Sequence, residues 1–174
     1  MLTKSLRPIG FDDYQKEEWD VYWARVSTID ASEAHREFFR QVVYDHFDHF
    51  NEHYPDFTIE DYEFTLKIYT VKEVDELVRF FMNVKMELWT EQFDEFQKSN
   101  HPYFIFQRMS KDLTPPFPPI FIDSSELIDK DWRVYGRPLH LIEGTHRFSY
   151  LIHMARKNII SWSSAHKFVL LVHK

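Results

Sequence analysis

The chain contains no cysteine, only three glycines among 174 residues, and no long apolar run. The absence of cysteine excludes disulfide bonds, thiolate metal sites and thiol nucleophiles. The scarcity of glycine excludes a collagen-like chain. Because no apolar segment approaches the 18 residues of a membrane-spanning helix, and residues 1–11 do not resemble a secretory signal, we expect a cytoplasmic protein with no membrane partner.

Apolar and aromatic side chains are, in contrast, abundant. Apolar residues make up 44% of the sequence and aromatic residues 18%, which is too hydrophobic for a disordered chain and typical of a packed globule. A chain of this length suits one domain, so we expect residues 1–174 to fold as a single unit. The aromatic rings are expected in the core, and a base-stacking platform is the alternative.

Acidic and basic residues are unevenly distributed. Residues 1–102 contain 22 Asp and Glu against 11 Lys and Arg, whereas residues 103–174 contain 6 against 10. A positive potential attracts anions, and an acidic surface repels a nucleic-acid backbone. We therefore expect a small anionic ligand in the carboxyl-terminal third and do not expect sequence-specific DNA binding. The acidic helices are either solvated faces or a docking surface for a protein partner.

Hydrophobic spacing predicts a first amphipathic helix over residues 30–54. Its apolar residues recur every three or four positions. Asp30 and Glu33 resemble a capping box at its start, and Pro55 ends it. His46, His49 and His53 share one face of this helix, where two histidines four residues apart can ligate a metal. Since no signature supplies further ligands, a partly buried polar margin is the expected reading of these histidines.

A strand and a second helix are predicted next. Residues 62–69 alternate strictly between apolar and polar, which indicates a half-buried strand with Ile68 on the buried face. Thr70 and Glu73 form another capping box, after which helical spacing predicts one long helix as far as Lys98.

The carboxyl-terminal third has shorter elements. Residues 103–106 are predicted as a strand, the proline-rich residues 114–119 as an extended connector, and residues 124–128 as a short helical turn. The remaining segments alternate between strand and helix: strand 120–123, strand 138–142, helix 145–157 and strand 167–172. The fold class is therefore α+β (mixed α/β), with amino-terminal helices packed on a small mixed sheet.

One segment combines residue types that bind phosphate. An apolar strand leads into Glu143 and Gly144, and the first turn of the following helix carries Thr145, His146 and Arg147. Unpaired amides and the helix dipole favour negative charge at such a terminus, and the glycine allows a phosphate to approach closely. The arginine adds a charge-assisted contact. The carboxylate can position Mg²⁺ or accept a proton.

The segment Gly144-Thr145-His146-Arg147 resembles the nucleotide-binding signature of the ParB/sulfiredoxin-like superfamily, which is often Gly-x-His-Arg at a strand-to-helix turn. The flanks resemble it too. Residues 118–120 are similar to the proline-led strand before the signature, and residues 167–172 to the strand after its helix. The resemblance covers residues 118–172, about a third of the chain.

The resemblance implies a nucleotide-binding site. Members of the superfamily cradle the phosphates of ATP or CTP on this turn, and related kinases use an acidic residue beside it. It implies that residues 144–147 bind phosphate and that Glu143 and His146 are catalytic. It also implies Mg²⁺, bound with the nucleotide, at Glu143 and Asp123.

The sequence departs from the superfamily in three ways. Sulfiredoxin needs a cysteine where Thr145 stands, which excludes sulfinic acid reduction. Tyr150 replaces the small residue common three places after the arginine, which changes the shape of the pocket. No helix-turn-helix follows the signature, which argues against ParB-like DNA binding. The alternative is a turn with a purely structural role, in which Gly144 permits the bend and Thr145 caps the helix.

Two functions are compatible with these features. The first is a small nucleotide- or phosphate-binding protein that transfers or hydrolyses a phosphoryl group. The alternative is a non-enzymatic module, immunity- or antitoxin-like, in which a reduced pocket is retained and the acidic helices bind a protein partner. An open, anion-binding turn at Gly144 favours the first, and a blocked turn the second.

Overall fold

The computed structural model describes residues 1–10, 15–27, 31–85, 89–130 and 133–174. By its internal contacts the chain divides into two compact units. We call Met1–Thr65 with Val172–Lys174 the helical unit and Leu66–Leu171 the sheet unit. The expectation of a single cooperative domain stays a prediction. Among the described residues, no helix combines the length and apolar character needed to cross a membrane.

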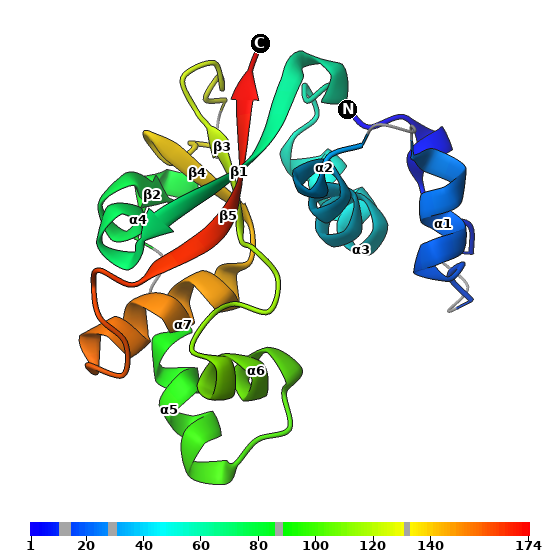
Figure 1. The fold of residues 1–174 in the computed structure, drawn as a ribbon. Coiled ribbons are helices and arrows are strands. Elements are labelled where there is room, and N and C mark those ends of the chain that lie inside the picture. Colours follow the sequence, from blue (N-terminus) through cyan, green and yellow to red (C-terminus); the bar gives the residue numbers. More distant parts are fainter. Residues whose placement is uncertain (11–14, 28–30, 86–88, 131–132) are drawn as a thin grey trace. The chain divides into compact units, whose positions relative to one another are not determined.

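The predicted mixed α+β fold is confirmed, and its sheet has five strands in the order β1-β5-β3-β4-β2 (Figure 1). Strand β3 runs antiparallel to β4 and parallel to β5, and β2 runs parallel to β4. Strands β1 and β5 cross the boundary between the two units. The strands are β1 (Tyr62–Thr70), β2 (Val78–Arg79), β3 (Ile120–Asp123), β4 (Leu139–Glu143) and β5 (Ala165–His173).

The helical unit contains the first predicted helix, in three connected parts. These are α2 (Glu33–Phe38), a π-helical segment (Phe39–Tyr44) and α3 (Asp45–His53), which follow α1 (Trp19–Val26). The capping residue is Ser32, whose Oγ accepts a hydrogen bond from the His35 amide at 3.2 Å. Asp30, the predicted cap, lies outside the described residues. His46 has non-helical dihedral angles, which introduces a kink near the start of α3.

The last residues of the described chain complete the helical unit. The backbone amide of Lys174 donates to the carbonyl of Asp61 at 2.9 Å, and its Nζ donates to the carbonyl of Glu60 at 2.7 Å. The ring of His173 lies edge-on to Tyr62, with 5.4 Å between centroids. The helical unit is therefore held together in part by contacts between residues far apart in the sequence.

The region after β1 differs from the predicted long helix. The capping box is confirmed, since the Glu73 amide donates to Thr70 Oγ1 and the Thr70 amide donates to the Glu73 carboxylate. The helix α4 (Val71–Leu77) then ends, because Val78 and Arg79 pair with β4 as strand β2. The placement of Ile68 on the buried face is also wrong. Its side chain is 71% exposed on the edge strand β1.

Helices α5 (Thr90–Ser99) and α6 (Phe104–Asp112) follow, and both contact α7 (Thr145–Arg156). The predicted strand at residues 103–106 is therefore wrong. Phe106 and Met109 are buried at helical spacing, so packing on neighbouring helices decides the conformation. Helix α7 lies between the sheet and the α5–α6 pair in Figure 1.

The other carboxyl-terminal elements agree with the sequence patterns. Strands β3, β4 and β5 and helix α7 are present, and residues 114–119 form a connector without helix or strand. The short helical turn predicted at residues 124–128 is a single turn, closed by a hydrogen bond from the Leu127 amide to the Ser124 carbonyl. Phe121 stacks on Phe168 and meets Phe148 of α7 edge-on, which joins sheet and helix. This packing fixes the junction between β4 and α7.

Candidate functional site

The junction between β4 and α7 is a tight turn at Gly144. Gly144 has φ of 98° and ψ of 32°, a left-handed conformation that favours glycine. The first helical hydrogen bond runs from the Phe148 amide to the Gly144 carbonyl at 2.8 Å. The amides of Thr145, His146 and Arg147 therefore precede the first intrahelical bond, where the dipole of the 12-residue α7 favours an anion.

The guanidinium of Arg147 folds back over this turn. Arg147 is only 5% exposed, and its Nη2 donates to Glu143 Oε1 at 3.1 Å, while Nη1 donates to the Phe117 carbonyl at 3.4 Å. A Cβ atom added to Gly144 would lie 2.9 Å from Nη2 and 3.0 Å from the Cβ of Pro119. The missing side chain at Gly144 thus makes room for the arginine.

His146 lies within an aromatic wall beside the turn. Its ring stacks on Trp89 with 4.2 Å between centroids and an interplanar angle of 21°, and Tyr103 meets it edge-on at 5.6 Å. Burial lowers the pKa of His146, although the negative charge of Glu143 opposes that shift. The imidazole is therefore neutral near pH 7 and adds no positive charge to the turn.

Tyr150, the residue expected to change the shape of the pocket, is fully buried and contacts α5. Its hydroxyl donates to Gln92 Oε1 at 2.7 Å, and burial raises its pKa. One turn further along α7, His153 Nε2 donates to Asp94 Oδ1 at 2.8 Å and Lys157 also contacts Asp94. The hydrogen bond from His153, followed by that from Lys157, holds the pKa of Asp94 below its usual range. These contacts fasten α5 to α7.

Asp123 does not lie at the turn, so the predicted magnesium site shared with Glu143 is wrong. Strands β3 and β4 are antiparallel, with Ile120 opposite Glu143 and Asp123 opposite Leu139. The backbones of Asp123 and Glu143 are therefore at opposite ends of the strand pair, about 13 Å apart along the strands at the usual rise per residue. Asp123 Oδ1 instead accepts a hydrogen bond from the Ser125 amide, as a turn residue does.

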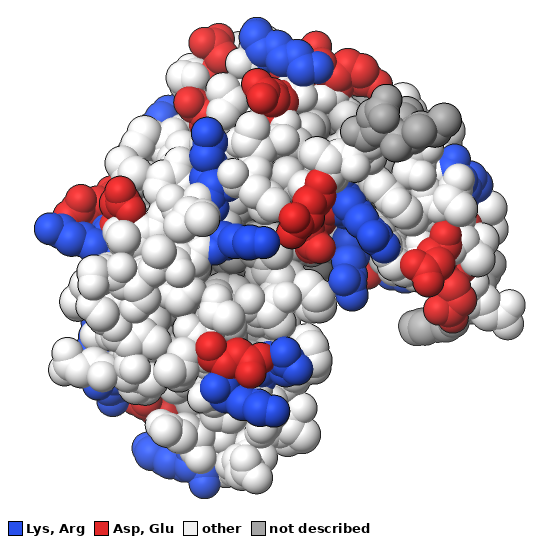
Figure 2. Space-filling view, in the orientation of Figure 1, with Lys and Arg blue, Asp and Glu red and all other residues white. Residues whose placement is uncertain are grey.

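The two units differ in charge. The helical unit contains 15 Asp and Glu against 7 Lys and Arg, whereas the sheet unit contains 13 against 14. On the face shown in Figure 2, basic side chains are interspersed with acidic ones, and the described residues form no continuous basic stripe there. The nearly balanced charge of the sheet unit therefore suits a compact anion better than an extended polyanion.

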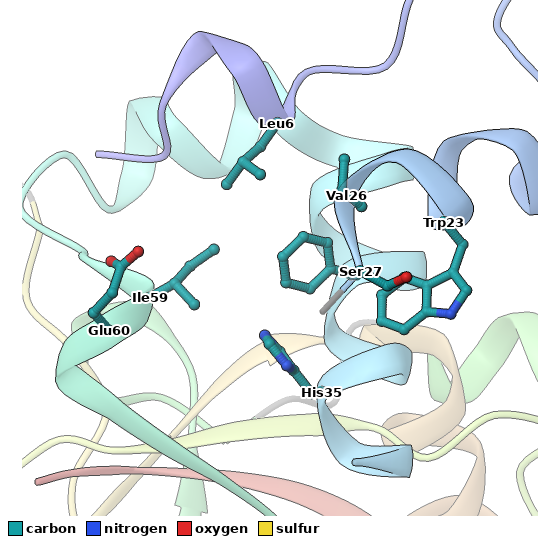
Figure 3. Close-up of a pocket in the computed structure, with 8 residues that line it drawn as sticks. Leu6, Trp23, Val26, Ser27, His35, Ile59 and Glu60 are labelled. Atoms are coloured by element: carbon teal, nitrogen blue, oxygen red, sulfur yellow. The ribbon is translucent and has the colours of Figure 1, made fainter. Parts of the chain in front are cut away.

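A cavity of about 160 Å³ lies in the helical unit, away from any residue that the sequence patterns single out (Figure 3). Its lining is largely apolar, and the imidazole of His35 points into it. His35 Nε2 is buried without a hydrogen-bond partner in the described structure, and burial lowers the pKa of His35. The lining residues are Leu6, Trp23, Val26, Ser27, His35, Phe39, Ile59 and Glu60.

The structure thus brings together Glu143, Gly144, Thr145, His146 and Arg147 and separates Asp123 from them. Sequence patterns missed Trp89, Tyr103 and Phe117, because distant parts of the chain bring them to the turn. Comparison of the chain with models of protein families, with characterised proteins and with solved structures found no match.

Proposed function

We propose that the Gly144 turn binds the phosphate of a nucleotide such as ATP or CTP, or another small anion. The observation that carries this proposal is the position of the Arg147 guanidinium, which lies over a glycine-initiated helix terminus beside the first amides of α7. Helix-terminal amides and an arginine fork are complementary to phosphate oxygens. An anion is also more compatible with the nearly balanced charge of the sheet unit than with the more acidic helical unit.

Binding at this turn is an exchange of partners. Arg147 already pairs with Glu143, so an incoming phosphate replaces the carboxylate as the arginine's partner. The side chain of Glu143 is 29% exposed and can turn to solvent when it is released. The expected affinity is therefore modest, because a salt bridge is broken for each one formed.

Magnesium, which the resemblance implies, has a reduced donor set here. Of the two expected carboxylates, only Glu143 lies at the turn. Mg²⁺ is commonly held by one or two carboxylates together with substrate phosphates and water. The ion would therefore depend on the nucleotide's own oxygens, with Glu143 as a single protein ligand.

For phosphoryl transfer or hydrolysis, the turn offers three groups. The Glu143 carboxylate, once released from Arg147, can accept a proton from a hydroxyl or water nucleophile. The imidazole of His146 is neutral and held by Trp89, so it can donate or accept a hydrogen bond without adding charge. Arg147 stabilises negative charge on the phosphoryl oxygens.

Calorimetric titration with ATP, CTP and inorganic phosphate, each with and without Mg²⁺, tests the proposal. Arg147→Ala should weaken binding at least tenfold, which corresponds to about 1.4 kcal/mol and is within the range of a hydrogen bond to a charged group. Arg156→Ala, at the far end of α7, is the matched control and should bind like the wild type. Circular dichroism confirms that each variant is folded.

The non-enzymatic protein-binding module is the second candidate. It is favoured by the Arg147–Glu143 ion pair, which fills the turn with the chain's own side chains. Absence of saturable binding to all three ligands at millimolar concentration, or equal affinity in wild type and Arg147→Ala, would support the module over the nucleotide site.

A further inference from the structure

Three potential metal ligands meet on one face of α3. His49, Glu52 and His53 each offer a ligand atom, and these atoms all lie within 4.8 Å of one another. The spacing of three and four residues places them on adjacent turns of the same face. His49 and Glu52 are exposed and His53 is half-buried, so an ion can reach all three from solvent.

The two imidazoles of the cluster lie in contact with each other. Their ring centroids are 4.1 Å apart, and Nδ1 of His53 lies 2.9 Å from the carbonyl oxygen of His49. A carbonyl oxygen can only accept, so Nδ1 of His53 carries the proton and the lone pair of the neutral ring is on Nε2. Such a hydrogen bond to a carbonyl fixes the tautomer and orientation of many metal-ligating histidines.

His46, which the sequence pattern groups with the other two histidines, is not part of this cluster. Its dihedral angles, φ of −133° and ψ of 30°, depart from the helix and interrupt the regular face. Glu52 takes its place as the third donor. The result is two imidazole nitrogens and one carboxylate oxygen, the donor set His-x-x-Glu-His on a single helix.

We propose that His49, Glu52 and His53 bind one divalent transition-metal ion, with Zn²⁺ the best fit. Mixed imidazole and carboxylate donors suit Zn²⁺, Ni²⁺ and Cu²⁺, whereas Mg²⁺ and Ca²⁺ prefer oxygen ligands alone. Zinc–nitrogen bonds of about 2.0 Å require ligand atoms roughly 3.3 Å apart in a tetrahedron, so the ligand atoms of this cluster, now within 4.8 Å of one another, must move closer by side-chain rotation.

The site has an open coordination position. Three protein ligands leave the fourth position of a tetrahedral zinc ion to water or to an external donor. The acidic helical unit, with 15 Asp and Glu against 7 Lys and Arg, also attracts a cation. This metal site is independent of the Gly144 turn, which belongs to the sheet unit.

This assignment is tested by removing bound metal from the full chain and then titrating the chain with ZnCl₂ in a calorimeter. We expect one saturable ion per chain in the wild type and no binding heat with MgCl₂. Loss of one of the three ligands, in His49→Ala, Glu52→Ala or His53→Ala, should weaken zinc binding at least tenfold. His46→Ala is the matched control on the same helix and should leave the affinity unchanged.

Absorption by bound cobalt provides a second readout of the site. Co²⁺ in a site of low coordination number with nitrogen ligands gives visible absorption bands, and these should disappear in the double variant His49→Ala/His53→Ala. The proposal is overturned if the wild type shows no saturable zinc binding up to 100 µM, or if the double variant binds zinc as tightly as the wild type. Circular dichroism recorded before metal is added shows whether each variant is folded.

Discussion

The Gly144 turn and the α3 face differ in how far their charged and metal-ligating side chains are exposed to solvent. At the turn, Arg147 is buried and paired with Glu143 inside the sheet unit. On α3, the cluster formed by His49, Glu52 and His53 is open to solvent in the helical unit. A ligand at the turn must displace part of the protein, whereas an ion on α3 only draws side chains together. Substitutions at the turn should therefore change both stability and ligand binding, whereas substitutions of the α3 ligands should change metal binding and leave the stability of the metal-free chain nearly unaltered.

The largest expected effect is that of Gly144→Ala. A side chain at this left-handed position is strained and approaches both Arg147 and Pro119 within about 3 Å. We expect the free energy of unfolding to fall by about 2 to 4 kcal/mol, as measured by urea denaturation. Glu52→Ala on α3 should change it by less than about 0.5 kcal/mol. Similar losses in both variants would remove the contrast between the two sites.

Glu143→Gln should separate stability from binding at the turn. The substitution leaves the buried guanidinium of Arg147 without its charged partner, which should lower the free energy of unfolding by about 1 to 2 kcal/mol. It also removes the competitor for phosphate. Inorganic phosphate should therefore raise the melting temperature of Glu143→Gln more than that of the wild type. An equal or smaller rise would contradict the exchange of partners.

Two helix caps test whether the units unfold together. Thr70→Ala removes the capping box of α4 in the sheet unit, and Ser32→Ala removes the cap of α2 in the helical unit. Each substitution should lower the free energy of unfolding by about 1 kcal/mol. If the chain is one cooperative unit, both variants shift a single urea transition by similar amounts. Two transitions, each moved by only one of the variants, would show that the predicted single domain is wrong.

Acidification should lower the stability of both units. Burial lowers the pKa of His35 in the helical unit and of His146 and His166 in the sheet unit. Between the folded and unfolded pKa values the unfolded chain binds more protons, so stability is present above the ordinary histidine pKa of about 6.5 and falls as the pH drops below it. Urea midpoints at pH 7.5 and 5.5 measure the loss, and His166→Gln should reduce it. A midpoint that rises on acidification would contradict this account.

Local patterns in the sequence predicted the elements that are held by local interactions. The capping box at Thr70, the extended conformation of β1 and the turn at Gly144 each depend on residues close together in the chain, and all three are present. The alternating burial expected along β1 is not, since Ile68 is exposed. The failures involve distant partners. The helix predicted as far as Lys98 is interrupted because Val78 pairs with Leu139, about 60 positions later.

At the candidate site, too, features set by neighbouring residues could be predicted and features set by distant residues could not. The Gly-x-His-Arg pattern located Gly144 and Arg147 correctly at the start of a helix. It could not reveal the antiparallel register that separates Asp123 from Glu143, because register is set by pairing between strands. On α3 the spacing of Glu52 from both histidines was visible in the sequence, but only the kink at His46 shows which three residues form the cluster.

The closing contacts of the helical unit have a consequence for biosynthesis. Residues 1–65 leave the ribosome long before residues 172–174, which tie Asp61 and Tyr62 through Lys174 and His173. The helical unit can therefore be completed only after the entire sheet unit, residues 66–171, has been translated. Nascent chains halted before Val172 should be more sensitive to protease in residues 1–65 than the released protein.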